Sequence, residues 1–147
     1  PSWVFRWRTC GPARITVVNR THARAVDLVQ RHAALALLQK TELTAPDIRA
    51  LEGYFDVIIN ATASSLGGGA VPVPASVLRP GALALDMMYG EAAQGFMDWA
   101  HQHGAIPRDG LGMLVEQAAE AFTLWRGVRP PSAQVLVELR AHMAVPA

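Results

Sequence analysis

The sequence has little of several residue types, and each shortage excludes a class of protein. Its 147 residues include one cysteine, Cys10, and one lysine, Lys40. A single cysteine excludes an internal disulfide and a cysteine-based zinc site. No apolar run approaches the roughly 20 residues that a membrane-spanning helix needs, and the chain does not open on a signal-peptide pattern. We therefore expect a soluble, cytoplasmic protein.

Several catalytic motifs are also missing. The sequence has no Gly-x-Ser-x-Gly nucleophile elbow, no Walker loop and no paired-carboxylate arrangement. Its five histidines are scattered over the polar faces of predicted helices, and the closest pair, His101 and His103, does not share a helix face. The sequence therefore predicts no metal site.

The composition is that of a globular domain with an uneven charge distribution. Hydrophobic residues make up 51% of the chain and charged residues 17%, which favours one folded domain over disorder. Residues 1–40 hold seven Lys or Arg against one Asp, or +6, whereas the rest hold six basic and eleven acidic residues, or −5. The basic first quarter suggests an anionic partner. Nucleic acid is not expected, because no nucleic-acid-binding motif accompanies the charge.

From residue 15 onward, strand and helix patterns alternate as in a Rossmann-like, doubly wound and mostly parallel α/β sheet. Short buried strands are predicted at residues 15–18, 34–38, 55–60, 82–87 and 105–108. Helices are predicted at residues 22–32, 93–103, 113–125 and 132–142, with helical turns at 46–51 and 74–78 and a loop at 61–69. The third of the long helices should end at Gly127, a favoured residue just beyond a helix.

Residues 1–14 fit this pattern badly and form an atypical leader before a domain of residues 15–147. Residues 3–7 have strand propensity, yet too few residues separate them from Ile15 for a parallel crossover. They could form an antiparallel hairpin with the next strand, or an irregular or helical leader. The pattern favours neither.

Arg20 and Arg24 flank the start of the first predicted helix, with Thr21 as its N-cap. Arg24 stands where a capping box would have Glu or Gln, so it places a cation at the positive end of the helix dipole. A bound phosphate would relieve that conflict. In a dinucleotide-binding fold, an arginine after the second strand accommodates the 2′-phosphate of NADP. A solvated arginine pair is an equally good interpretation of these residues alone.

Three further stretches lie where parallel strands end, the edge at which open α/β sheets bind ligands. Asn60-Ala61-Thr62 ends the strand at 55–60, and Asp86-Met87-Met88-Tyr89 ends the next one. Gln117 lies in the helix that follows Gly110 and shares a face with Met113, which suggests an amide directed at the core or at a cleft. Taken singly, each stretch fits an ordinary strand end or a core glutamine better than a site.

Taken in order, these stretches resemble the shikimate dehydrogenase family over about residues 12–142. The motifs are Asn19-Arg20-Thr21 with Arg24; Asn60-Ala61-Thr62; Asp86-Met87-Met88-Tyr89; and Asp109-Gly110-Leu111-Gly112-Met113-Leu114-Val115 through Gln117 to Phe122, Trp125, Gly127 and Pro130. The ordered run is far more specific than any one motif. It resembles the family's NADP-binding lobe and C-terminal helices.

The resemblance implies an activity and a set of contact residues. The activity is the reversible, NADPH-dependent reduction of 3-dehydroshikimate to shikimate, a chorismate-pathway step in aromatic amino-acid biosynthesis. The implied NADP-binding residues are Asn19, Arg20, Thr21 and Arg24 at the adenosine 2′-phosphate, Met87 and Gly110 at the nicotinamide, and Asn60, Ala61 and Thr62 along the cofactor cleft. Tyr89 and Gln117 would touch shikimate or 3-dehydroshikimate.

The sequence also departs from the family pattern. The family's first strand, its glycine-rich turn and its N-terminal substrate domain, with the catalytic Lys and Asp, are absent from the chain, and Lys40 cannot replace that lysine. We therefore expect little or no turnover by this chain alone. In the strand order 3-2-1-4-5-6, the missing strand leaves a gap in mid-sheet, which predicts self-association through the open edge. The alternative function is a non-catalytic NADP-binding or self-associating interaction module.

Overall fold

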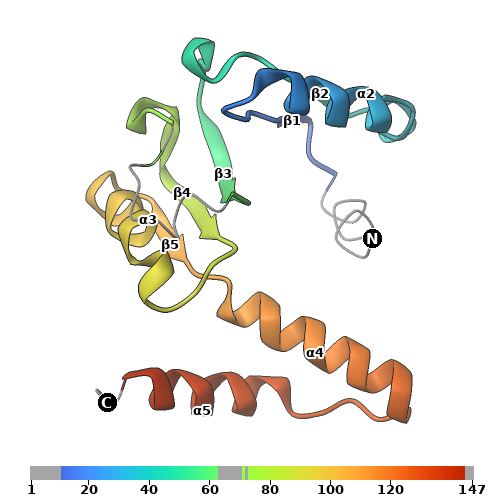
Figure 1. The fold of residues 1–147 in the computed structure, drawn as a ribbon, viewed down its shortest axis with the longest axis vertical. Helices are drawn as coiled ribbons and strands as arrows, with labels where there is room; N and C mark the ends of the chain where they lie inside the picture. The colour runs from blue at the N-terminus through green and yellow to red at the C-terminus, as the bar shows by residue number, and fades with distance from the viewer. Residues whose placement is uncertain (1–10, 63–70, 72, 145–147) are drawn as a thin grey trace. The chain divides into compact units, whose positions relative to one another are not determined.

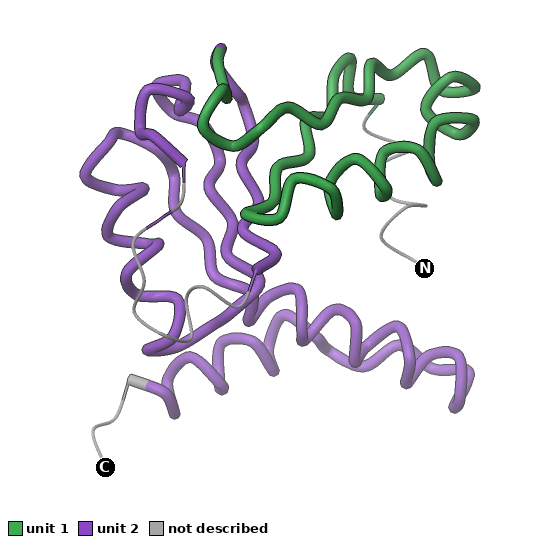
Figure 2. Tube along the Cα trace, turned by 45° about the horizontal axis from the view of Figure 1, so that its top comes forward, with its two compact units in different colours: residues 1–52 green, residues 53–147 purple. Residues whose placement is uncertain are grey.

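A computed structural model describes residues 11–62, 71 and 73–144 of the chain (Figure 1). The chain divides into two compact units, Pro1–Glu52 and Gly53–Ala147 (Figure 2). Most of the predicted leader and the loop after Thr62 lie outside the described residues. No helix of the described residues is long and apolar enough to cross a membrane.

Unit 1 contains a two-stranded parallel sheet and one long helix. β1 (Arg14–Thr16) pairs with β2 (Glu42–Thr44), with Ile15 opposite Leu43. The threonines that end the two strands share a hydrogen bond of 3.2 Å between their hydroxyl oxygens. Helix α2 (His22–Leu38) connects the strands, and a 3-10 turn, η1 (Ile48–Ala50), follows them. This is the β–α–β unit that the alternating pattern predicts for the start of the domain.

The strand predicted at residues 34–38 is wrong, because those residues form the last turns of α2. The segment is rich in alanine and leucine, the strongest helix formers, and nothing before Leu38 stops the helix. The chain turns at Lys40, which has a positive φ of 54°, and the strand follows at Glu42. The first strand is also shorter than predicted and ends at Thr16.

Unit 2 contains a three-stranded parallel sheet in the order β3-β4-β5. β3 spans Phe55–Asn60, β4 spans Leu78–Asp86 after the 3-10 turn η3 (Ala75–Val77), and β5 spans Ile106–Arg108. Helix α3 (Glu91–Gln102) joins β4 to β5, and two longer helices follow, α4 (Leu111–Arg126) and α5 (Ser132–Ala144). Gly127 ends α4 with a φ of 71°, as predicted.

The two faces of this sheet differ in burial. On one face, Ala84 is fully buried in a cluster with Phe96 and Ala100 of α3. On the other face, Val57 of β3 lies opposite Leu83 of β4. These two side chains are 42% and 36% exposed, so α3 supplies the core of unit 2 from one side.

The predicted fold class is confirmed as a mixed α/β fold with parallel strands. β3 is an edge strand of its sheet, and among the described residues its only partner strand is β4. In the order 3-2-1-4-5-6, the first strand joins the two halves of the sheet. Among the described residues the strands form two separate sheets, one in each unit.

Candidate functional site

Hydrogen bonds to Asp86 link the carboxyl ends of β3 and β4. The Asp86 side chain is fully buried at the end of β4. One carboxylate oxygen accepts a hydrogen bond of 3.0 Å from the Asn60 side-chain amide. The other accepts one of 2.8 Å from the backbone N–H of Met88. Both oxygens are therefore engaged in fixing the turn after β4, which suits a structural role better than proton transfer.

The Asn60 side chain joins this network to the turn after β3. Its oxygen accepts hydrogen bonds from the backbone N–H and the hydroxyl of Thr62, at 3.2 Å and 2.8 Å. Thr62 and Ala61 are exposed, whereas Asn60 is half-buried. The predicted cofactor-cleft residues thus form one ordered turn at the expected edge of the sheet.

Gly110 lies in the turn between β5 and α4, pressed against the chain that follows β4. Its N–H donates a 2.8 Å hydrogen bond to the carbonyl of Met88. A Cβ added at Gly110 would lie 2.2 Å from the carbonyl oxygen of Met87, far closer than two such atoms can approach. Only glycine fits this contact, so the backbones after β4 and β5 meet directly.

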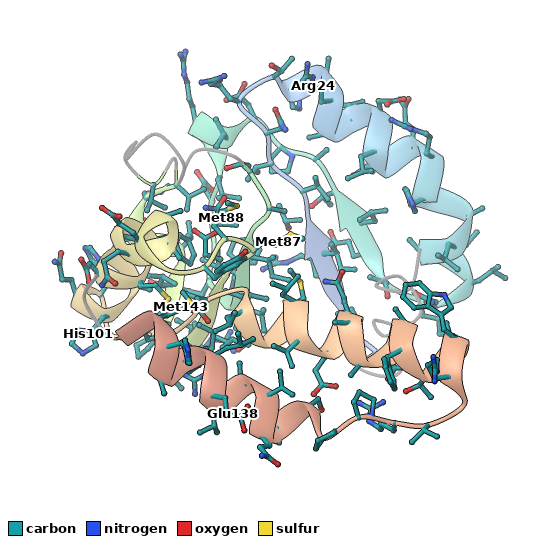
Figure 3. The ribbon with its side chains drawn as sticks, turned by 60° about the horizontal axis from the view of Figure 1, so that its bottom comes forward. Arg24, Met87, Met88, His101, Glu138 and Met143 are labelled. Atoms are coloured by element: carbon teal, nitrogen blue, oxygen red, sulfur yellow. The ribbon has the colours of Figure 1, made fainter. Side chains whose placement is uncertain are left out.

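Met87 and Tyr89 lie on the turn that this network fixes (Figure 3 labels Met87). They are 41% and 43% exposed. An exposed methionine offers a polarizable apolar surface to a planar ring, and an exposed tyrosine offers a hydroxyl to a polar ligand. The structure therefore gathers Asn60, Met87, Tyr89 and Gly110 at one edge of the sheet in unit 2.

Gln117 does not face the core, so the core is excluded as one of the two predicted directions of its amide. The buried face of α4 carries Leu111, Val115 and Ala119, whereas Gln117 is exposed and Leu124 is 84% exposed. The prediction chose the wrong set of positions, because α4 is apolar on several sides. The substrate contact of Gln117 stays a prediction.

The predicted phosphate residues lie together in unit 1, at the start of α2. Arg20 precedes the helix and Arg24 lies in its first turn, and both side chains are exposed (Figure 3 labels Arg24). Neither guanidinium has a hydrogen bond or an ion pair within the described part of the chain. The first turn contains no acidic residue. Two cations and the helix start thus present positive charge to solvent.

Asn19 and Thr21 shape this helix start. The Asn19 side-chain oxygen accepts a 2.9 Å hydrogen bond from the backbone N–H of Thr21. Thr21 is the N-cap, as predicted, but its hydroxyl makes no capping hydrogen bond. The Thr21 hydroxyl therefore remains available to a ligand, which is consistent with a predicted contact at the phosphate.

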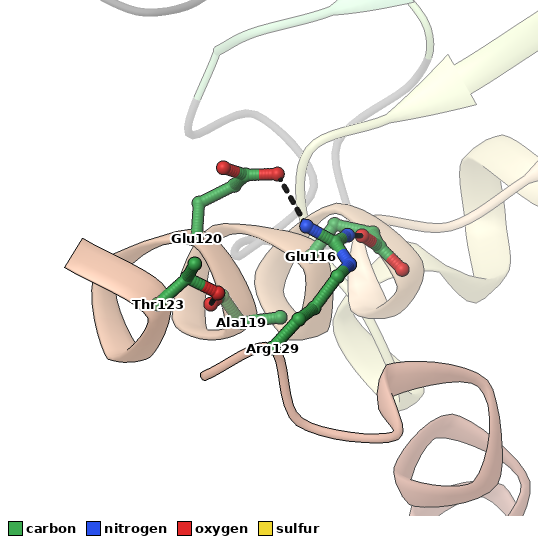
Figure 4. Close-up of polar contacts among 5 residues, drawn as sticks. All are labelled: Glu116, Ala119, Glu120, Thr123 and Arg129. Carbon is green, nitrogen blue, oxygen red and sulfur yellow. Dashed lines mark hydrogen bonds and ion pairs between the residues drawn. The ribbon is translucent and has the colours of Figure 1, made fainter. Parts of the chain in front are cut away.

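Two ion-pair clusters beyond the predicted site anchor the C-terminal helices. Arg129 pairs with Glu116 and Glu120 at 2.7 Å each (Figure 4), and these bonds raise the pKa of its guanidinium. Arg140 of α5 pairs with Asp109, and the hydrogen bond raises the pKa of Arg140. Neither pair was predicted, because their partners are 9 to 31 residues apart and no periodic pattern connects residues at such separations.

Comparison with known proteins supports the resemblance drawn from the motifs. The family described as the shikimate 5′-dehydrogenase C-terminal domain matches residues 110–138. A shikimate dehydrogenase (NADP(+)) from Acidovorax ebreus (strain TPSY) is 76% identical over 133 residues, which cover 90% of this chain and 47% of the relative. The chain thus spans about half the length of the curated relatives it matches.

Solved structures agree with the sequence relatives. An Ael1 enzyme from Pseudomonas putida superposes with a TM-score of 0.77 at 37% identity, over 97% of this chain and 50% of that one. A shikimate 5-dehydrogenase from Thermus thermophilus, in complex with NADP(H) and shikimate, has a TM-score of 0.62 at 27% identity, over 93% and 49%. The resemblance to the shikimate dehydrogenase family is therefore confirmed, and it concerns the C-terminal part of the relatives.

Proposed function

Because the chain is related to the C-terminal half of the shikimate dehydrogenases, we propose that it is an NADP-binding lobe of such an enzyme. The proposed reaction is the reversible reduction of 3-dehydroshikimate to shikimate, in the cytoplasm. The observation that carries the proposal is the pair of exposed arginines, Arg20 and Arg24, at a helix start without an acidic residue. An acidic residue there would favour NAD, whereas arginine accommodates a 2′-phosphate.

Each unit, taken by itself, carries residues suited to one part of the cofactor. In unit 1, the guanidinium groups of Arg20 and Arg24, with Asn19 and Thr21, would hold the adenosine 2′-phosphate through charge-assisted hydrogen bonds. In unit 2, Met87 and Gly110 would bound the nicotinamide, with Asn60, Ala61 and Thr62 lining the cofactor cleft. NADPH, when bound, supplies the hydride.

The substrate contacts proposed for this chain are Tyr89 and Gln117. Both side chains are exposed, and neither has a hydrogen bond to another described residue. The Tyr89 hydroxyl and the Gln117 amide could each bind a hydroxyl or carboxylate oxygen of shikimate. These groups would orient a substrate, whereas the Lys and Asp to which the resemblance assigns the catalytic role have no counterpart among the matched residues. We therefore propose little or no turnover by the chain on its own.

The cofactor proposal is tested by binding of NADP⁺ and NAD⁺ to the chain and to the double variant Arg20→Ala/Arg24→Ala. Loss of two charge-assisted contacts should weaken NADP⁺ binding about tenfold or more and leave NAD⁺ binding unchanged. Arg31→Ala is the matched control, because Arg31 is an exposed arginine of the same helix that pairs with Asp27. Equal affinity for NADP⁺ and NAD⁺ in the unmodified chain would refute the proposal.

A turnover assay separates the enzyme from a non-catalytic NADP-binding module. The chain spans about half of its relatives, so binding without oxidation of shikimate by NADP⁺ is the expected result. Detectable oxidation by the chain alone would contradict the proposed inactivity. Restored oxidation on adding the N-terminal half of a relative would favour the enzyme over the module.

We also propose that the chain self-associates through the edge of β3. This strand ends its sheet, and its Val57 and Ile59 side chains are 42% and 39% exposed. An edge strand with apolar neighbours is a template for pairing with another chain. Sedimentation should show dimers that dissociate in Val57→Lys. A well-folded monomer at high concentration would refute self-association.

A further inference from the structure

One face of α5 contacts three separate turns of unit 2. Leu136, Arg140 and Met143 are spaced by four and three residues, so they lie on one side of the helix. A Cβ added at Gly112, in the first turn of α4, would lie 3.8 Å from Leu136, and a Cβ added at Gly90 would lie 3.0 Å from Met143. Between these two contacts, Arg140 reaches Asp109.

The pair between Arg140 and Asp109 is bidentate. The two guanidinium nitrogens donate hydrogen bonds of 2.7 Å and 3.2 Å to the two carboxylate oxygens. The Asp109 side chain is only 10% exposed. Bidentate geometry fixes orientation as well as distance, so α5 sets the direction of the Asp109 side chain.

The turns contacted by α5 are those that carry the proposed ligand residues. Asp109 directly precedes Gly110, and Gly90 directly follows Tyr89. The Gly110 N–H is bonded to the carbonyl of Met88, so the two turns are also joined to each other. Movement of Asp109 would therefore reach both the nicotinamide contacts and the substrate contact proposed above.

From these contacts, we propose that Arg140 is a positioning residue. Through Asp109 it holds the turn at Gly110 against the turn after β4, and α5 thereby braces the nicotinamide edge of the site. The effect of Arg140 on ligand binding rests on the proposed cofactor function. The brace, meaning the contact through which α5 holds the turn at Gly110 against the turn after β4, is a property of unit 2 alone. Both residues line a shallow surface depression that is open to solvent, so solvent can reach Asp109 once the guanidinium is removed.

The brace is tested without any ligand by amide hydrogen exchange in Arg140→Gln. Exchange at the Gly110 N–H should become about threefold to tenfold faster. In the unmodified chain, opening of the turn must also break the ion pair, and in the variant it does not. Amides of β4 should keep their protection, which shows that unit 2 remains folded. Arg140→Lys keeps the charge but not the bidentate geometry, so its exchange rate should be intermediate.

Arg129→Gln is the matched control, because it removes a doubly paired arginine that contacts α4 away from these turns. It should leave Gly110 exchange unchanged. If Arg140→Gln also leaves Gly110 exchange unchanged, or if Arg129→Gln accelerates it equally, the brace is refuted.

A second measurement connects the brace to the site. Arg140→Gln should weaken NADP⁺ binding about fivefold, while 2′,5′-ADP, which lacks the nicotinamide, should bind as before. Equal effects on the two ligands would refute a role at the nicotinamide edge. Failure of the unmodified chain to bind 2′,5′-ADP would refute the proposed function instead, and the exchange experiment would still decide on the brace.

Discussion

Unit 1 and unit 2 each carry residues proposed to bind the cofactor, and the two units differ in the size of the core that supports those residues. Among the described residues, eleven of the thirteen buried hydrophobic side chains lie in unit 2, and only Ala25 and Ala36 lie in unit 1. The strands of unit 1 have three residues each, whereas β3 and β4 have six and nine. Unit 2 therefore has the larger hydrophobic core, although its β5 is as short as the strands of unit 1.

The difference matches what each part must do. Binding a phosphate by Arg20 and Arg24 depends on exposed charges on flexible side chains, which need only a helix start to carry them. The turn at Gly110 depends on two backbones that approach to contact distance, which needs a packed core behind it. Recognition of a phosphate by charge therefore needs less of the fold than the close backbone contact at Gly110.

The largest effect should come from Phe96→Ala, which removes the main aromatic side chain of the core of unit 2. Phe96 is 4% exposed and packs with Ala84 and Ala100. We expect a loss of about 3–5 kcal/mol in the free energy of unfolding of unit 2. Amide exchange should accelerate in β4, with a smaller change in α2. Equal acceleration in both units would contradict the difference between them.

A slightly smaller effect is expected from Asp86→Ala. The change leaves the Asn60 amide and the Met88 N–H without their shared acceptor, which should cost about 2–4 kcal/mol in denaturant unfolding. Asp86→Asn keeps one acceptor oxygen and should cost less. Equal stability of the two variants would show that the hydrogen bonds to Asp86 do not stabilise the turn.

Gly110→Ala should destabilise unit 2 by about 1–3 kcal/mol, because the new methyl group collides with the Met87 carbonyl. Gly95→Ala is the control. A Cβ at Gly95, inside α3, meets nothing within 4 Å, so alanine should raise stability by about 0.5–1 kcal/mol. Thermal unfolding of the two variants should shift in opposite directions, and shifts in the same direction would contradict the close approach.

The smallest effect should follow Arg31→Ala in unit 1. Arg31 and Asp27 form an exposed pair one helical turn apart in α2. Such pairs contribute about 0.3–0.5 kcal/mol. The free energy of unfolding measured by chemical denaturation should therefore hardly change. A loss above about 1 kcal/mol would show that this ion pair stabilises unit 1 more than exposed pairs normally do.

The prediction from sequence was correct for elements bounded by strong turn or stop residues, and it failed where such residues are lacking. Residues 55–60 are a mostly apolar, β-prone segment that follows a glycine-containing turn and ends at Asn60, and β3 has those bounds. The stop at Gly127 was equally clear. The strand expected at 34–38 failed because alanine-rich segments have no period that separates a buried strand from a helix. The first and last residues of other elements shifted by a few positions for the same reason.

The site could be predicted as a set of residues but not as a network. Strand ends told us that Asn60, Met87 and Gly110 share an edge, since parallel strands end together. The burial of Asp86 and the pairing of Arg140 with Asp109 depend on contacts between distant segments. The exposure of Gln117 depended on which side of α4 meets its neighbours, and hydrophobic periodicity left that open.

The most direct test of the cofactor proposal is an NMR titration of the isotope-labelled chain with 2′,5′-ADP and with 5′-AMP. We expect 2′,5′-ADP to shift the backbone amides of residues 19–24, and 5′-AMP, which lacks the 2′-phosphate, to shift them far less. Equal shifts with the two nucleotides, or no shifts at residues 19–24, would contradict the cofactor proposal.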